Sequence, residues 1–349
     1  MSSVALGFLR ERRFLVAILA LLFSAISLFA AIRPSDCARA AKYSESKRGM
    51  AMLVIQNGAT VFEHYANGGS PDGRWPIFSG TKSFWGIAAL CAVRDGLIKL
   101  DQPVADTISE WKNDPRKSQI TIRQLLNFTD GIDGASMLHR SSIPNRDAMA
   151  IRLPLLAQPG TVFIYGPSHL QIFTELLRRK LNGQSAAGYV QRNVLSPLGL
   201  SGLDFKSDRR GNPLPASGFE LAAHEWARLG ELVLNRGSYH GRQIVSGALL
   251  QQAFAGSSAN PAYGLTFWLN RQAPGAPEVD IEKELDLPWQ RAHWNYVSIA
   301  RAAPPDMIVG LGSDYQRLFI IPSMNAVIVR QGRNAKFSDG HFLALLLGR

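Results

Sequence analysis

A serine and a lysine stand three residues apart, at Ser79 and Lys82, where a long apolar segment begins. On a helix, residues at i and i+3 share one face, so the hydroxyl and the amine would lie side by side. A serine held beside a lysine is a candidate nucleophile, because the amine can accept the hydroxyl proton. A serine at a helix N-terminus also places its own backbone N–H where an oxyanion could bind.

The same spacing occurs twice more in the chain, at Ser44 with Lys47 and at Ser109 with Lys112. Ser44 lies in a polar, charged stretch. Ser109 is followed closely by Asn-Asp-Pro, where an amphipathic helix cannot continue. Only Ser79 has an apolar helix behind it, so we interpret Ser79 as the nucleophile and the other two as chance matches.

The first 32 residues indicate export. Three arginines precede an uncharged run over residues 14–32, which is long for a signal peptide and just long enough to span a bilayer. Small residues at 38–40 offer a cleavage site, but the run can equally stay as an anchor with its arginines inside. Residues 1–40 are therefore interpreted as a signal peptide or a membrane anchor. The protein is expected in the periplasm or on the outer face of the inner membrane.

Composition excludes several other classes of protein. The 349 residues carry a net charge of +11, but no basic run with interleaved aromatics appears, which argues against a nucleic-acid partner. The seven histidines show no i,i+4 pair and no Cys/His spacing, so we expect no metal site. Cys37 and Cys91 imply no disulfide framework. No cofactor is expected, and the oligomeric state is left open.

Strand patterns gather at the two ends of the chain and helix patterns in the middle. The expected strands are residues 50–55, 60–65, 315–322 and 326–331, and the expected helices are residues 122–128, 169–181, 186–194, 222–234, 246–254 and 339–347. Asn57-Gly58 predicts a tight hairpin turn between the first two strands. This is an α/β (α+β) fold with one antiparallel sheet built from both ends. An α/β lobe (about 41–78 and 256–349) would hold an inserted helical lobe (about 79–255), with a small-molecule cleft between them.

Further landmarks follow Ser79 in a definite order. They are residues 96–104, 120–132, 159–165, 197–200 and 216–218. Together with Ser79-Gly80-Thr81-Lys82 they resemble the serine β-lactamase and penicillin-binding family. The similar branch holds class C β-lactamases, D-alanyl-D-alanine carboxypeptidases and related esterases and amide hydrolases. The resemblance spans residues 50–347 and implies that fold and a serine hydrolase.

The resemblance also implies roles for single residues. Ser79 would be the acyl-accepting nucleophile and Tyr165 a second base. Lys82, buried beside Ser79, would accept its proton or lower the pKa of the true base. The family's tyrosine usually leads a Tyr-x-Asn triplet, but Gly166-Pro167 follows Tyr165 here, so the amide is missing. Ser168 or His169 could supply that hydrogen bond, or each could cap the next helix.

The family's third motif, Lys-Thr-Gly or His-x-Gly, corresponds to Gly310-Leu311-Gly312 and carries no cation. Gly310 and Gly312 would line the cleft, and the N–H of Ser313 would complete an oxyanion hole with that of Ser79. A carboxylate-bearing substrate would lose its charge partner there. Asp130, where the family commonly has serine, is expected in a turn or cap. Residues 273–299 are expected to form either a lid over the cleft or a plain surface excursion.

These patterns lead to one preferred function and two alternatives. We expect an exported, cofactor-independent serine hydrolase that acts on an ester or small amide through an acyl-serine intermediate. The first alternative is a D-Ala-D-Ala carboxypeptidase or β-lactamase, with a peptide or β-lactam as substrate. The second is a non-catalytic envelope protein that keeps the fold as a ligand-binding or sensor module.

Overall fold

Strands from both ends of the chain form one six-stranded antiparallel sheet. The computed structural model describes residues 31–271, 277–294 and 298–349. The strand order is β2-β1-β10-β9-β8-β7. The strands are β1 (Gly49–Gln56), β2 (Ala59–Tyr65), β7 (Trp268–Leu269), β8 (Ile308–Gly312), β9 (Gln316–Ile321) and β10 (Ala326–Gly332). Leu53 of β1 pairs with Val329 of β10, so the prediction that the two ends meet in one sheet is confirmed.

Two asparagine turns set the hairpins of this sheet. Asn57 and Gly58 have φ values of 54° and 76°, which place both in the left-handed region that a tight turn between β1 and β2 needs. Between β9 and β10, a 3-10 turn (Pro322–Met324) ends at Asn325, which has φ 45°. Asparagine tolerates this region better than most residues, because its short side chain can hydrogen-bond locally.

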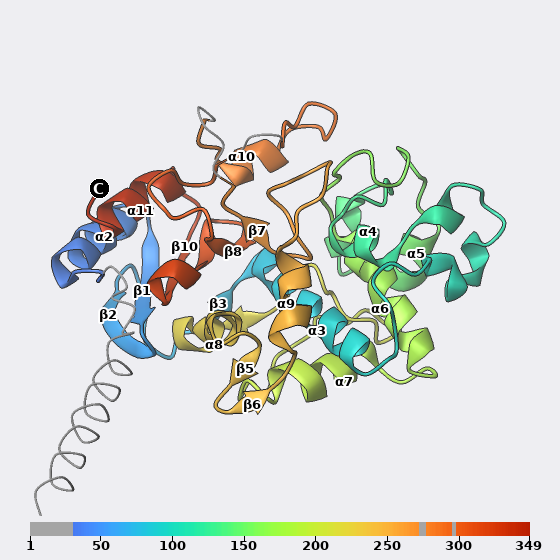
Figure 1. Ribbon diagram of the computed structural model, residues 1–349, viewed down its shortest axis with the longest axis horizontal. Coiled ribbons are helices and arrows are strands. Elements are labelled where there is room, and N and C mark those ends of the chain that lie inside the picture. Colours follow the sequence, from blue (N-terminus) through green and yellow to red (C-terminus); the bar gives the residue numbers. More distant parts are fainter. Residues whose placement is uncertain (1–30, 272–276, 295–297) are drawn as a thin grey trace, which may run out of the picture. The chain divides into compact units, whose positions relative to one another are not determined.

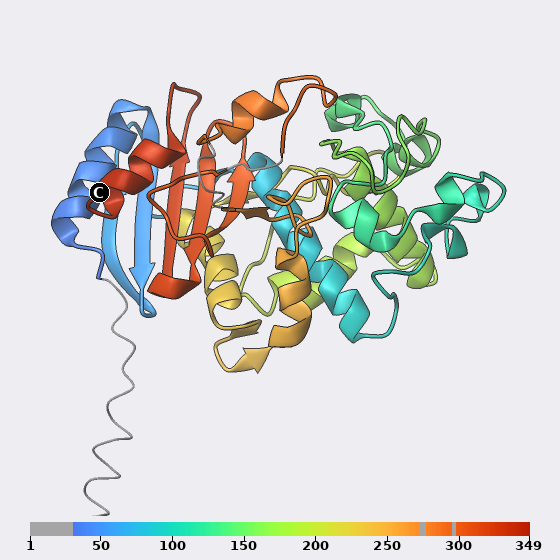
Figure 2. The same cartoon turned by 45° about the horizontal axis from the view of Figure 1, so that its top comes forward.

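Helices cover both faces of the sheet (Figure 1 and Figure 2). Helices α2 (Pro34–Ser46) and α11 (Asp339–Leu346) lie side by side on one face. Helix α8 (Ala223–Leu234) packs on the other face, against β9 and β10. Side-chain alternation along β10 separates the two contacts: Val327 lies against Gly230 of α8, whereas Arg330 bonds to Ser44 of α2.

The remaining helices form the second part of the fold, around helix α3. They are α3 (Thr81–Arg94), α4 (Ile122–Leu126), α5 (Arg146–Ile151), α6 (Ser168–Lys180), α7 (Ala186–Val190) and α9 (Gly247–Gln251). Helix α10 (Ile281–Leu285) lies instead beside the sheet, where its Glu282 pairs with Arg317 of β9. Two small ribbons, β3 (Trp75–Pro76) with β4 (Glu220–Leu221) and β5 (Ser238–Tyr239) with β6 (Arg242–Gln243), lie outside the main sheet. Residues 81–92 of α3 are buried on every side, as expected of a helix at the centre of a fold.

The predicted boundaries need two corrections. The folded unit begins at Ile32 rather than near residue 41, because α2 packs on the sheet with Cys37 and Ala40 fully buried. The candidate cleavage site at 38–40 thus lies within α2. Helix α8 belongs with the sheet, although the sequence placed it in the helical lobe. The apolar run 14–32 lies almost wholly outside the described residues, and within those no helix is long and apolar enough to cross a membrane.

The close approach of α8 to the sheet predicts an unusual result for a helix glycine. A Cβ on Gly230 would lie 2.6 Å from a methyl carbon of Val327. Alanine is a better helix former by about 1 kcal/mol, but overpacking of a core typically costs 1–3 kcal/mol. We therefore expect Gly230→Ala to lower the free energy of unfolding, measured by urea denaturation.

Gly188 in α7 is the matched control, because the nearest atom to its Cβ position is the mobile end of Arg192 at 3.3 Å. Gly188→Ala should be neutral or stabilising. Equal gains in stability for the two variants would contradict the tight packing of α8 on β10.

Candidate active site

Ser79 sits in a single 3-10 turn (Phe78–Gly80) directly before α3. Phe78 has φ 44°, a strained conformation for a bulky residue, and such strain is typical of functional sites. A Cβ on Gly80 would lie 2.5 Å from the ring of Trp226 on α8. The glycine after Ser79 is therefore required by packing, and it lets the turn press against α8.

Lys82 lies directly beside Ser79. Its Nζ is 2.8 Å from the Oγ of Ser79 and donates a second hydrogen bond, also of 2.8 Å, to the carbonyl oxygen of Ala216. The side chain is buried, and no acidic residue in the described part of the chain forms an ion pair with it. Burial without a counter-charge lowers the pKa of Lys82 to about 7. A large fraction of the amine is then unprotonated at neutral pH and can accept the Ser79 proton.

Tyr165 is the third member of this group. The Nζ of Lys82 lies 4.8 Å from the centre of the Tyr165 ring, and neighbouring rings fix that ring's orientation, Phe128 at 5.5 Å and Trp268 at 5.9 Å. Burial raises the pKa of the phenol well above 10, and a hydrogen bond with Ser79 opposes this shift. The geometry brings Ser79, Lys82 and Tyr165 together, and at neutral pH Lys82 is the better proton acceptor.

Ser168 and His169 lie at the start of α6 with other partners. The Oγ of Ser168 donates to the carbonyl of Asp133 at 2.6 Å, so this buried hydroxyl fixes a loop rather than facing a cavity. His169 Nδ1 is 2.6 Å from Asp130 Oδ2, and its ring stacks on Phe128. Asp130 also accepts the backbone N–H of Ile132, which is the expected turn role. Because Ser168 and His169 bond to Asp133 and Asp130, and no side-chain hydrogen bond caps α6 within the described residues, the capping interpretation of these two residues is wrong.

The strand that carries the third motif presses against the Ser79 turn. A Cβ on Gly312 would lie 2.0 Å from the carbonyl oxygen of Ile77, two residues before Ser79. Among the described strands, β7 pairs with β8 only at Ile308 and Val309. Beyond these two residues, the edge of β8 that faces β7 has no partner strand among the described residues. Ser313 is exposed in the turn that follows. Its proposed contribution to an oxyanion hole stays a prediction.

Residues 277–294 belong to the segment 273–299 that was expected to form a lid or a surface excursion, called the excursion below. They are attached to the sheet through Arg317. Glu282 of α10 lies 3.0 Å from this fully buried guanidinium, which also pairs with Asp339 of α11 at 2.8 Å. Arg317 donates to the carbonyl of Gly312 as well, at 2.9 Å. Residues 273–276 and 295–297 of the expected lid lie outside the described residues. The described part is anchored to the sheet and forms one wall of a cavity.

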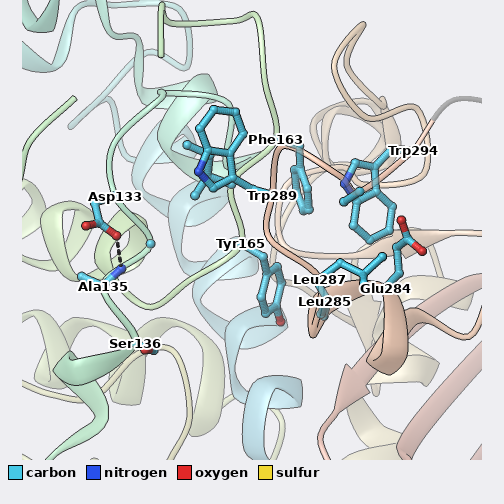
Figure 3. Close-up of a pocket in the computed structure, with 13 residues that line it drawn as sticks. Asp133, Ala135, Ser136, Phe163, Tyr165, Glu284, Leu285, Leu287, Trp289 and Trp294 are labelled. Carbon is cyan, nitrogen blue, oxygen red and sulfur yellow. Dashed lines mark hydrogen bonds between the residues drawn. The ribbon is translucent and has the colours of Figure 1, made fainter. Parts of the chain in front are cut away.

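This cavity has a volume of about 230 Å³ and opens beside Tyr165 (Figure 3). Its lining residues are 133–136 from one loop, 163–165 from the segment that carries Tyr165, and 284, 285, 287, 289, 292 and 294 from the excursion. Ser79 is not among them. Tyr165 therefore contacts both the Ser79–Lys82 pair and this cavity, where a substrate's acyl or leaving group could lie.

Sequence reasoning missed two features near the site. His139 Nδ1 lies 3.1 Å from the Oγ of Ser217, the neighbour of the Ala216 carbonyl that holds Lys82. The landmark at 216–218 pointed to this place, but nothing in the sequence singled out His139. Nothing in the sequence indicated the Arg317–Glu282 pair either, because these two residues are 35 positions apart and belong to no periodic pattern.

Comparison with known proteins agrees with this geometry. A family model described as Beta-lactamase matches residues 35–331. The chain belongs to the Beta-lactamase family. It is a serine hydrolase of that family, so the resemblance seen in the sequence is confirmed, as are the predicted fold class and enzyme class.

Its similarity to individual proteins is more distant. "Protein flp" of Staphylococcus aureus strain MRSA252 is 26% identical over 191 residues, which cover 50% of this chain and 38% of flp. "Acyltransferase calJ" of Penicillium decumbens is 30% identical over 152 residues, 36% of each chain. The chain thus spans well under half the length of these relatives. The solved structure of EstCE1, "a hydrolase with promiscuous acyltransferase activity", superposes with a TM-score of 0.68 at 16% identity, covering 90% of this chain and 98% of EstCE1.

Two glycines of this Beta-lactamase-family chain give a matched test of how β8 positions the nucleophile. Gly312→Ala forces Ile77, and with it the Ser79 turn, to move, and a misplacement of about 1 Å can cost 10²-fold in rate. Fluorophosphonate labelling of Ser79 should therefore slow by about 10- to 100-fold. In Gly310→Ala the new Cβ meets only ordinary contacts, 3.5 Å from Leu318 and 3.6 Å from Ser83, so the loss should be far smaller. Equal labelling rates in the two variants would show that β8 does not position Ser79.

Proposed function

We propose that the protein hydrolyses an ester or small amide through an acyl-serine intermediate. The observation that supports this proposal is the Lys82–Ser79 contact of 2.8 Å, with a lysine whose pKa is about 7 and whose amine has no acidic partner among the described residues. An unprotonated amine in contact with a half-buried serine hydroxyl is the arrangement that activates a nucleophile.

In the proposed reaction, Ser79 Oγ bonds to the substrate carbonyl carbon while its proton passes to Lys82. Backbone N–H groups of Ser79 and Ser313 would stabilise the oxyanion. The proton then moves to the leaving group as the C–O or C–N bond breaks, with the Tyr165 hydroxyl relaying it. Water finally hydrolyses the acyl-serine. No step calls for a cofactor.

Absence of a cation in the third motif favours neutral substrates over carboxylates. Gly310 and Gly312 offer only backbone groups, and the cavity beside Tyr165 is lined by Asp133 and Glu284. A penicillin or a D-Ala-D-Ala peptide carries a carboxylate, which would lose a charge-assisted hydrogen bond. The carboxypeptidase or β-lactamase function therefore stays the alternative, as does a non-catalytic ligand-binding module.

We also propose that the protein is exported, to the periplasm or to the outer face of the inner membrane. The support is the sequence alone, from the arginines before residue 14 and the apolar run 14–32. Its partners would be small-molecule esters, amides or peptides.

Substrate comparison on the full-length protein tests the proposed function. A charge-assisted hydrogen bond contributes roughly 1.5–3 kcal/mol, or about one to two decades in specificity. We expect kcat/KM for neutral short-chain p-nitrophenyl esters to exceed that for nitrocefin or a D-Ala-D-Ala peptide by at least about tenfold.

Ser79→Ala should abolish turnover of all these substrates, whereas Ser109→Ala, at an exposed position with the same Ser-x-x-Lys spacing, should leave it unchanged. Ser44 is unsuitable as a control, because it is buried and bonded to Arg330. Faster turnover of nitrocefin or the peptide than of any ester would favour the first alternative. A protein that neither turns over a substrate nor forms a fluorophosphonate adduct would be the binding module.

The pH dependence separates the two candidate bases. Since the unprotonated amine accepts the proton and burial lowers the pKa of Lys82 to about 7, kcat/KM should rise with pH as the pH passes 7. Tyr165→Phe should lower the rate by at least the ~10²-fold typical of a general base but keep this rise, whereas Lys82→Ala should lose it. The double variant should lose much less than the product of the single losses. Disappearance of the rise near pH 7 in Tyr165→Phe would instead identify Tyr165 as the base.

A further inference from the structure

We propose that the cavity beside Tyr165 binds a positively charged group of the substrate, a protonated amine or a quaternary ammonium. This inference rests on the proposed function, because it names the class of ester or amide that the same site would take. It is carried by the cavity's aromatic faces and its carboxylates, and one buried donor adds a place for an acceptor oxygen of the same ligand.

The first observation is an aromatic box. Phe163 packs edge-to-face on Trp294, with ring centres 5.2 Å apart, and lies 6.2 Å from the Tyr165 ring. Trp289 lines the same cavity (Figure 3). The faces of aromatic rings carry negative potential, and boxes of several rings are a known means of binding quaternary ammonium groups.

The second observation is a carboxylate at each end of this box. Figure 3 shows Asp133 and Glu284 on opposite sides of the aromatic rings. Each uses one oxygen to accept a backbone N–H, from Ala135 at 2.9 Å and from His293 at 2.8 Å. In the described ranges neither forms an ion pair with a lysine or arginine, and no cationic side chain is among the cavity's lining residues. The two negative charges are therefore left for a ligand.

The third observation is a donor without a partner. Trp294 is only 5% exposed, and its Nε1 finds no hydrogen-bond acceptor among the described residues. Figure 3 shows this nitrogen on the side of the indole that faces Phe163. A buried donor left unpaired costs free energy, so an acceptor oxygen of a ligand would be favoured here.

The net charge of the protein would not create a preference for cationic ligands. The chain carries a net charge of +11, which repels cations, so the selectivity would have to come from the cavity itself. A volume of about 230 Å³ lies below the range typical of drug-sized ligands. It suits a small cationic group at the end of an acyl chain.

A pair of isosteric esters tests this inference in the full-length protein. One is the p-nitrophenyl ester of trimethylammonio-hexanoate, and the other replaces its charged nitrogen by carbon. We expect kcat/KM to be at least about tenfold higher for the cationic ester, a difference of roughly 1.4 kcal/mol. Glu284→Gln and Asp133→Asn each keep a side-chain oxygen that can accept the backbone N–H of His293 or Ala135. Each should lower the ratio, and the double variant should bring it close to one.

Asp286→Asn is the matched control, because it removes one negative charge from an exposed position next to α10 that does not line the cavity. It should leave the ratio unchanged. An equal or higher rate for the neutral ester would overturn the inference and make the cavity an apolar acyl site. An equal fall in the ratio in Asp286→Asn would also overturn it, since net charge would then be the cause.

A binding measurement keeps the inference separate from catalysis. Titration calorimetry with hexyltrimethylammonium should show binding to the wild type and to Asp286→Asn, and little binding to the Asp133→Asn/Glu284→Gln double variant. If neither ester is hydrolysed but this pattern appears, the proposed function fails and the cation site stands. If the esters are hydrolysed without a cation preference and hexyltrimethylammonium does not bind, the hydrolase stands and the cation site fails.

Discussion

Burial of Lys82 without a counter-charge is the constraint on which the site depends. A protonated amine in the centre of a fold would normally require a carboxylate, because the cost of desolvation exceeds what neutral hydrogen bonds return. Here the described partners of Nζ are the Ala216 carbonyl and the Ser79 hydroxyl. A low pKa follows, and a lysine that is half unprotonated near pH 7 is suited to exchange a proton with Ser79.

Close contacts at three glycines hold the serine where this lysine can reach it. Gly230 brings α8 onto the sheet, Gly80 lets the Ser79 turn press against α8, and Gly312 lets β8 press against the same turn from the strand side. Each of these contacts leaves less room than a Cβ needs. The turn is therefore clamped between a helix and a strand, which helps to explain how Phe78 can keep its strained backbone.

The short-range features of this site could be predicted from the sequence, but its long-range contacts could not. Alternating strands, the Asn57-Gly58 turn and the Ser79–Lys82 spacing follow short-range rules, and the structure has them where they were predicted. The helix over 34–46 was missed because the apolar run before it suggested a targeting segment that extended to residue 40. The partner of Ser168 was missed for a different reason. Asp133 is 35 residues away, and no sequence pattern distinguishes its backbone carbonyl from any other.

Arg317 shows why the remaining part of the site escapes prediction and how the two halves of the site are joined. One buried guanidinium bonds to the Gly312 carbonyl on β8, to Glu282 on α10 and to Asp339 on α11. The strand beside the Ser79 turn and the wall of the cavity are thus fixed to the same side chain.

A fold of this kind supports many activities, so specificity must come from segments added around it. Residues 284–294 carry no landmark of the family, yet they supply Glu284, Trp289 and Trp294 to the cavity beside Tyr165. Because Arg317 anchors this segment through Glu282, substitutions in the excursion could alter the substrate preference without disturbing Ser79 and Lys82.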